Sequence, residues 1–174
     1  MAKEIWKAPL RDQFGAAIDM LERAIVAAPD AVWGDPAPQP QFWYVAFHTL
    51  FWLDRSLADP SEPFAPPAPF GLEEMDPAGA MPPRTYTKDE LLEYARHCRE
   101  RMHALVDGLT DETGAAPRKF NALQGTVYEV MLFNLRHVQH HTGQLNLILR
   151  QTTRSAAPRW VTREGDAMAP RPVA

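Results

Sequence analysis

The sequence predicts an all-α fold, a four-helix bundle with a long proline-rich crossover between its second and third helices. Four segments carry apolar residues at i, i+3/i+4 spacing, which is typical of helices that bury one face. No alternating polar and apolar run of convincing length occurs, so we expect few strands or none. The 174 residues suffice for one well-cored domain and are too few for two comfortable ones.

The first two helices are predicted on either side of a short turn. The first spans residues 9–28 and has a proline in its first turn, where the missing N–H breaks no helical hydrogen bond. Residues 34–40 are rich in proline and are turn material. A second apolar helix follows from about residue 40 to residue 58, so that His48 lies near its middle.

The crossover and the third helix are predicted from breakers and a cap. Prolines recur so often between residues 60 and 83 that no regular helix or central strand can persist there. Thr87-Lys-Asp-Glu90 is a capping box, which begins a third helix that ends at about Leu109. Cys98 falls in the apolar stripe of this helix, where a free thiol behaves as a small hydrophobe and not as a nucleophile.

A second capping box, Thr126-Val-Tyr-Glu129, begins the fourth helix, which is predicted to run for about seven turns. The bundle is expected to comprise residues 1–151. Residues 152–174 are rich in arginine, proline and small residues, and we expect them to form an irregular tail of the same domain. Trp160 and Val161 are the predicted anchor of that tail.

The fourth helix carries three imidazoles within two turns. Residues four apart differ by about 40° around a helix and about 6 Å along it, so His137 and His141 could bind one metal ion together. A third ligand is then needed, and His48 is the well-placed candidate because packed helix axes lie about 8–10 Å apart. Three histidine ligands leave one coordination position open, as in catalytic zinc sites.

Other roles near this cluster stay open on the sequence alone. The histidine pair could be ordinary core or boundary residues, since its spacing is common. His140 lies about 60° from His137 on the helical wheel, so angle alone does not exclude it as a ligand.

Asn134 could orient a ligand imidazole or bond to the backbone. No general base is identified, because no carboxylate lies on the ligand face; Asp54, about 120° off the face of His48, could at most support a ligand. His97 and His103 are expected at boundary positions away from the metal.

Composition argues against several classes of protein. The formal net charge is −4, the pI is near 5.8, and no basic stripe occurs, which argues against a nucleic-acid partner. No segment approaches the roughly 20 apolar residues of a membrane span, and the first residues lack the apolar core of a signal peptide. The single cysteine cannot form an internal disulfide. We therefore expect a cytoplasmic protein with no membrane partner.

His48 in one helix and the pattern His137-x-x-x-His141-x-Gly143-Gln144 in another resemble the DinB/YfiT-like superfamily, over about residues 9–151. The resemblance implies a bundle, often dimeric, in which these three histidines hold a divalent metal such as zinc or nickel near one end. Some relatives conjugate low-molecular-weight thiols such as bacillithiol or mycothiol to electrophiles. Thr142 departs from the pattern, because many members have arginine there.

The leading functional hypothesis is a metal-dependent enzyme of the thiol S-transferase or hydrolase type. Its expected partners are a small-molecule substrate, a low-molecular-weight thiol and a second copy of the chain. The alternative is a non-catalytic metal-binding or stress-related bundle, and a third interpretation is a metal-free helical interaction module. Structural zinc sites are usually closed by four protein ligands, so an open fourth position favours the enzyme.

Overall fold

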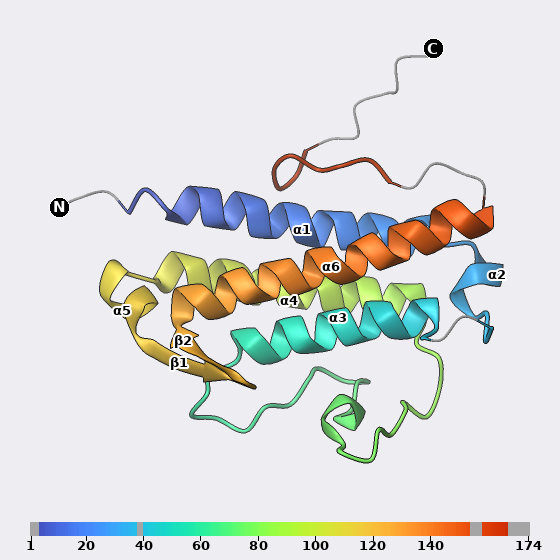
Figure 1. Cartoon of the computed structure of the whole chain (residues 1–174), viewed down its shortest axis with the longest axis horizontal. Helices are drawn as coiled ribbons and strands as arrows, with labels where there is room; N and C mark the ends of the chain where they lie inside the picture. The colour runs from blue at the N-terminus through green and yellow to red at the C-terminus, as the bar shows by residue number, and fades with distance from the viewer. Residues whose placement is uncertain (1–3, 38–39, 154–157, 167–174) are drawn as a thin grey trace, which may run out of the picture.

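The computed structural model describes residues 4–37, 40–153 and 158–166, and in them four long helices form a bundle (Figure 1). The long helices are α1 (Lys7–Ala27), α3 (Phe42–Leu57), α4 (Lys88–Gly108) and α6 (Val127–Thr153). The short elements are α2 (Asp30–Trp33), the 3-10 helix η1 (Glu73–Met75), α5 (Asp111–Ala115) and the strands β1 (Pro117–Phe120) and β2 (Leu123–Thr126). The predicted all-α bundle is confirmed, because the two strands form only a small hairpin at one end of it.

Each long helix packs against two neighbours: α1 and α3 both contact α4 and α6. In Figure 1, α1 and α6 run in one direction and α3 and α4 in the other. Because α3 and α4 are parallel, the chain between them must return along the length of the bundle. The proline-rich segment 60–83 makes this return, and η1 is its one helical turn in the described structure, as its proline content predicts. None of the helices described is both long and apolar enough to cross a membrane.

Both predicted capping boxes form. At the start of α4, Thr87 Oγ1 accepts a hydrogen bond from Glu90 N (3.2 Å), and Glu90 Oε2 accepts one from Thr87 N (2.8 Å). At the start of α6, Thr126 Oγ1 accepts from Glu129 N (3.2 Å) and Glu129 Oε2 accepts from Thr126 N (2.7 Å). These reciprocal bonds satisfy amides that have no partner within the helix, and they determine where the histidine-bearing helix begins.

The core is built from aromatic and aliphatic side chains of all four long helices, and the crossover is anchored against it. Phe70 of the crossover stacks on Tyr94 of α4 with their ring centroids 4.4 Å apart. Cys98 is fully buried beneath α3, and its thiol donates to Leu50 O at 3.6 Å. Burial raises the pKa of the Cys98 thiol, so this residue behaves as the predicted small hydrophobe.

The hairpin and the helices α2 and α5 are not among the predicted elements. Each helix or strand here has four or five residues, too few for a hydrophobic period to become visible. The strands pair antiparallel with Phe120 opposite Leu123, and Asn121 in the turn has φ 51°, a conformation that asparagine tolerates better than most residues. The hairpin thereby places Phe120 and Asn121 beside α3 and α6.

Residues 158–166 of the tail lie along α1 (Figure 1). Val161 is buried against α1, as predicted, whereas Trp160 is 70% exposed, so its predicted role as an anchor is wrong. Successive side chains of an extended segment point to opposite sides, which explains why only one of the two is buried. Helix α6 continues to Thr153. The other tail residues, 154–157 and 167–174, lie outside the described residues.

Candidate metal centre

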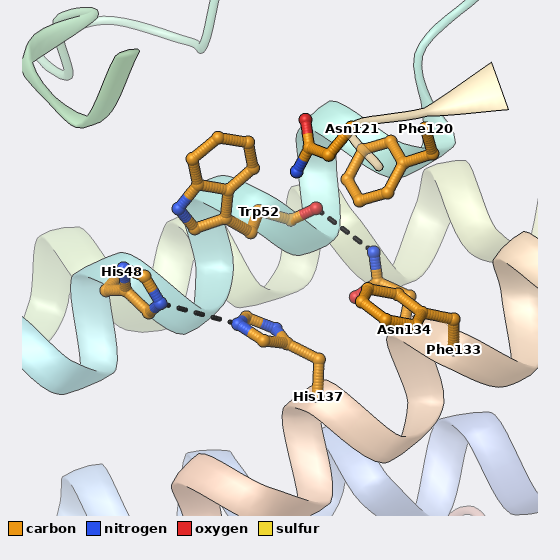
Figure 2. Close-up of a pocket in the computed structure, with 7 residues that line it drawn as sticks. All are labelled: His48, Trp52, Phe120, Asn121, Phe133, Asn134 and His137. Carbon is orange, nitrogen blue, oxygen red and sulfur yellow. Dashed lines mark hydrogen bonds between the residues drawn. The ribbon is translucent and has the colours of Figure 1, made fainter. Parts of the chain in front are cut away.

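His48 of α3 comes together with His137 and His141 of α6 where these two helices pack. Each imidazole offers one nitrogen, and the three atoms lie within 4.8 Å of one another. His48 Nε2 and His137 Nε2 point toward each other at 3.4 Å (Figure 2). The ring centroids of His48 and His141 are 4.8 Å apart. The structure therefore brings together the three residues proposed from the sequence as ligands.

Two of the three imidazoles have one nitrogen engaged outside the cluster. A carboxylate oxygen of Glu74 accepts from His48 Nδ1 at 2.7 Å, so Nδ1 carries the hydrogen and Nε2 retains its lone pair. The amide oxygen of Gln144 accepts from His141 Nδ1 at 2.7 Å, with the same consequence for His141 Nε2. Lone pairs that converge in this way are the donor set that a divalent cation requires.

The surroundings keep His137 and His141 neutral. Burial, followed by the neighbouring imidazoles, lowers the pKa of His137 from 6.5 to about 3. Burial is also the main cause that lowers the pKa of His141, against an opposing effect of its hydrogen bond to Gln144. Neutral imidazole is the form that binds metal, so both side chains are ready to act as ligands at pH 7.

A cavity of about 270 Å³ opens beside the cluster (Figure 2). Two of the three histidines are part of its wall, and most of the remaining wall is aromatic, with two amide side chains. The lining residues are His48 and Trp52 from α3, Phe120 and Asn121 from the hairpin, and Phe133, Asn134 and His137 from α6. A small molecule in this cavity would contact the edge of the histidine cluster directly.

The sequence model of the DinB superfamily matches residues 13–145, a span that holds all three histidines and most of the bundle. The chain belongs to the DinB superfamily. Among curated proteins, none matches the chain. The resemblance noted from His48 and the His137/His141 pattern is thus confirmed at the level of the family.

A carboxylate that sequence reasoning missed also reaches the cluster of this DinB-superfamily bundle. Glu74 of η1 accepts from His48 Nδ1 and, at 2.9 Å, from Trp52 Nε1. Burial raises the pKa of Glu74, but the bonds from His48 and Trp52 and the nearby Tyr44 hydroxyl lower it by more, so that the net pKa lies below its usual value. No periodic signal could have found Glu74, because it lies in the irregular crossover.

Asn134 joins the two ligand-bearing helices. Its side-chain Nδ2 donates to Trp52 O at 3.1 Å (Figure 2), so of the two roles considered for this residue the structure shows the bond to backbone. That backbone belongs to the opposite helix. Asn134 Oδ1 and His137 Nδ1 are both buried without a hydrogen-bond partner among the described residues. Asn134 therefore holds α6 against α3 one turn away from His137.

The remaining candidates lie elsewhere. His140 is exposed and is not part of the three-histidine group. Asp54 is buried between α3 and α4, where it accepts from the Tyr94 hydroxyl at 3.1 Å and pairs with Arg101, so it supports no ligand of the cluster. The two other histidines pair with carboxylates away from the cluster, as expected for boundary positions: His97 with Asp54 at 3.4 Å and His103 with Glu164 at 2.8 Å.

Proposed function

We propose that this DinB-superfamily protein is a metal-dependent enzyme that acts on a small molecule, by thiol transfer or hydrolysis. His48, His137 and His141 would hold one divalent ion, zinc or nickel. The observation that carries the proposal is the cavity of about 270 Å³ whose wall includes His48 and His137. Structural zinc sites are usually closed by four protein ligands, whereas three imidazoles beside a cavity leave room for a molecule from solution.

The chain's own residues supply binding and orientation. A divalent ion held by three imidazoles supplies Lewis acidity and lowers the pKa of a water or thiol bound to it. Trp52, Phe120 and Phe133 offer the apolar surface that would bind the body of a substrate and exclude water from it. Asn121 offers an amide that can donate to or accept from a polar substituent.

A thiol taking part in the reaction would have to come from solution. Cys98 is the one cysteine of the chain, and it is buried in the core between α3 and α4. This placement supports a low-molecular-weight thiol as the second reactant of a transferase. The dimer implied by the resemblance, the cytoplasmic location and the absence of nucleic-acid and membrane partners stay predictions.

The proposal is tested with protein purified without a metal-affinity tag. We expect elemental analysis to find about one zinc or nickel per chain. We also expect metal-loaded protein, but not chelator-treated protein, to turn over substrate in a screen of thiol and electrophile pairs and of small esters and amides. Metal without turnover in any class would favour the non-catalytic metal-binding bundle. No metal, even after incubation with both ions, would overturn the proposed site.

Metal affinity is expected to weaken as the pH falls, and this loss of affinity should be confined to acidic solution. Protons compete with the metal for each imidazole, so the sign of the effect is a loss on acidification. Because the pKa of His137 is lowered to about 3 and that of His141 is also lowered, this competition begins below the pKa of about 6.5 of a free histidine. Affinity should then fall about tenfold per pH unit for each ligand protonated. Calorimetric Zn²⁺ titrations at decreasing pH measure it, and an affinity that stays unchanged below about pH 3, where His137 itself becomes protonated, would contradict imidazole ligands.

A further inference from the structure

We propose that Glu74 is a positioning residue for His48, and that it couples metal binding to the conformation of the proline-rich crossover. The inference rests on the metal site proposed above. The carboxylate of Glu74 in η1 contacts the second nitrogen of His48, the proposed ligand in α3. Glu74 then affects how tightly the metal binds, and the bound metal affects how often the crossover opens.

The contacts of Glu74 are few and specific. Its side chain is only 4% exposed, and one oxygen, Oε2, accepts both from His48 Nδ1 at 2.7 Å and from Trp52 Nε1 at 2.9 Å. The other oxygen, Oε1, is buried without a hydrogen-bond partner in the described part of the chain. A buried carboxylate is costly unless it is paired or hydrogen-bonded. The two N–H groups of α3, together with the nearby Tyr44 hydroxyl of the same helix, therefore stabilise the carboxylate of Glu74 in this position.

The bond to His48 bears directly on metal binding. A carboxylate that accepts from Nδ1 holds the tautomer in which Nε2 is free, fixes the orientation of the ring and makes Nε2 more basic. His48 is the sole contribution of α3 to the three-histidine group, whereas the other two histidines share α6. If the His48 imidazole could rotate or change tautomer, the site would therefore lose strength on the α3 side, where no second ligand is available.

The same bond also fastens the crossover. The apolar neighbours of Glu74 in this segment, Leu72 and Met75, are exposed, so apolar burial does little to hold η1 against α3. Coupling between two binding events is reciprocal: if the Glu74 bond strengthens metal binding by some factor, metal binding strengthens the Glu74 bond by the same factor. Binding of metal should therefore make opening of residues 72–75 rarer.

The first experiment compares Glu74→Gln with Glu73→Gln. Both residues lie in η1 and both variants lose one negative charge, but Glu73 makes no described hydrogen bond or ion pair to His48. Metal-free proteins are titrated with Zn²⁺ alone and with Co²⁺, whose visible absorption bands report the geometry of its ligands. We expect E74Q to lose about 10- to 100-fold in Zn²⁺ affinity and to change the Co²⁺ spectrum, whereas E73Q behaves like the unmodified chain.

The second measurement is amide hydrogen exchange of residues 72–75 with and without Zn²⁺. Exchange should slow on Zn²⁺ binding in the unmodified chain and in E73Q, but not in E74Q. If the unmodified chain binds Zn²⁺ and its exchange at residues 72–75 does not respond, the inference is overturned while the metal site stands. This test needs only the unmodified chain, so it remains decisive if E74Q fails to fold. Equal Zn²⁺ affinity of folded E74Q and the unmodified chain would also overturn it. If the unmodified chain binds no metal, the proposed function and this inference fail together.

Discussion

Replacing His137 and His141 together by alanine is expected to abolish stoichiometric binding of zinc or nickel. Two of the three convergent nitrogens disappear, and His48 alone offers a single ligand. The loss of affinity should therefore exceed the roughly 10- to 100-fold effect expected for a residue that only supports a ligand. The helix itself should persist, because Val138, Leu145 and Leu149 of its buried face are unchanged. Elemental analysis and far-UV circular dichroism of the double variant measure both effects.

His140→Ala is the matched control for this experiment. His140 is adjacent to His141 on α6, but it is exposed and lies outside the three-histidine group. We expect this variant to bind metal as the unmodified chain does. Loss of metal in His140→Ala together with retention in the double variant would show that the proposed ligand set is wrong. His140, which helical geometry alone did not exclude, would then be a ligand.

The parts of the fold that could be predicted are those encoded locally. The four long helices follow from hydrophobic periodicity. The starts of two of them follow from capping boxes in which a threonine and a glutamate form reciprocal hydrogen bonds. The proximity of His137 and His141 needs only the pitch of one helix. Placing His48 beside them needs one further assumption, that their helices are neighbours, which the packing of α3 against α6 satisfies.

The parts that could not be predicted depend on irregular backbone. Glu74 reaches His48 across a separation of 26 residues through a crossover that has no period to follow. Phe120 and Asn121 reach the cavity on a hairpin of two four-residue strands, which is too short to produce a strand signal. The histidines could thus be predicted as a site, whereas the cavity wall and the carboxylate that supports His48 depend on the three-dimensional path of the connections.

Arg101→Ala is expected to lower the free energy of unfolding by about 3 kcal/mol, since removing one partner of a buried ion pair leaves the other charge uncompensated. Asp54 is fully buried in α3 and is paired with Arg101. Among the described residues it then keeps the Tyr94 hydroxyl at 3.1 Å and His97 at 3.4 Å as polar partners. We place the effect at the lower end of the usual range because the Arg101 side chain is 32% exposed. A lower urea midpoint at unchanged slope would measure it.

Arg96→Ala is the control on the same helix, because Arg96 also pairs with carboxylates, Glu93 and Glu100, but is 55% exposed. Exposed pairs contribute little, so we expect Arg96→Ala to lower the free energy of unfolding far less than Arg101→Ala does. A double variant, Asp54→Asn with Arg101→Ala, should be more stable than Arg101→Ala alone, because the buried charge is then gone. Equal losses for Arg96→Ala and Arg101→Ala, or no recovery in the double variant, would contradict the assignment.

Zn²⁺ affinity should stay unchanged in Arg101→Ala, because Asp54 lies outside the histidine cluster. Measuring the Zn²⁺ affinity of this variant therefore separates the stability of the bundle from the integrity of the site.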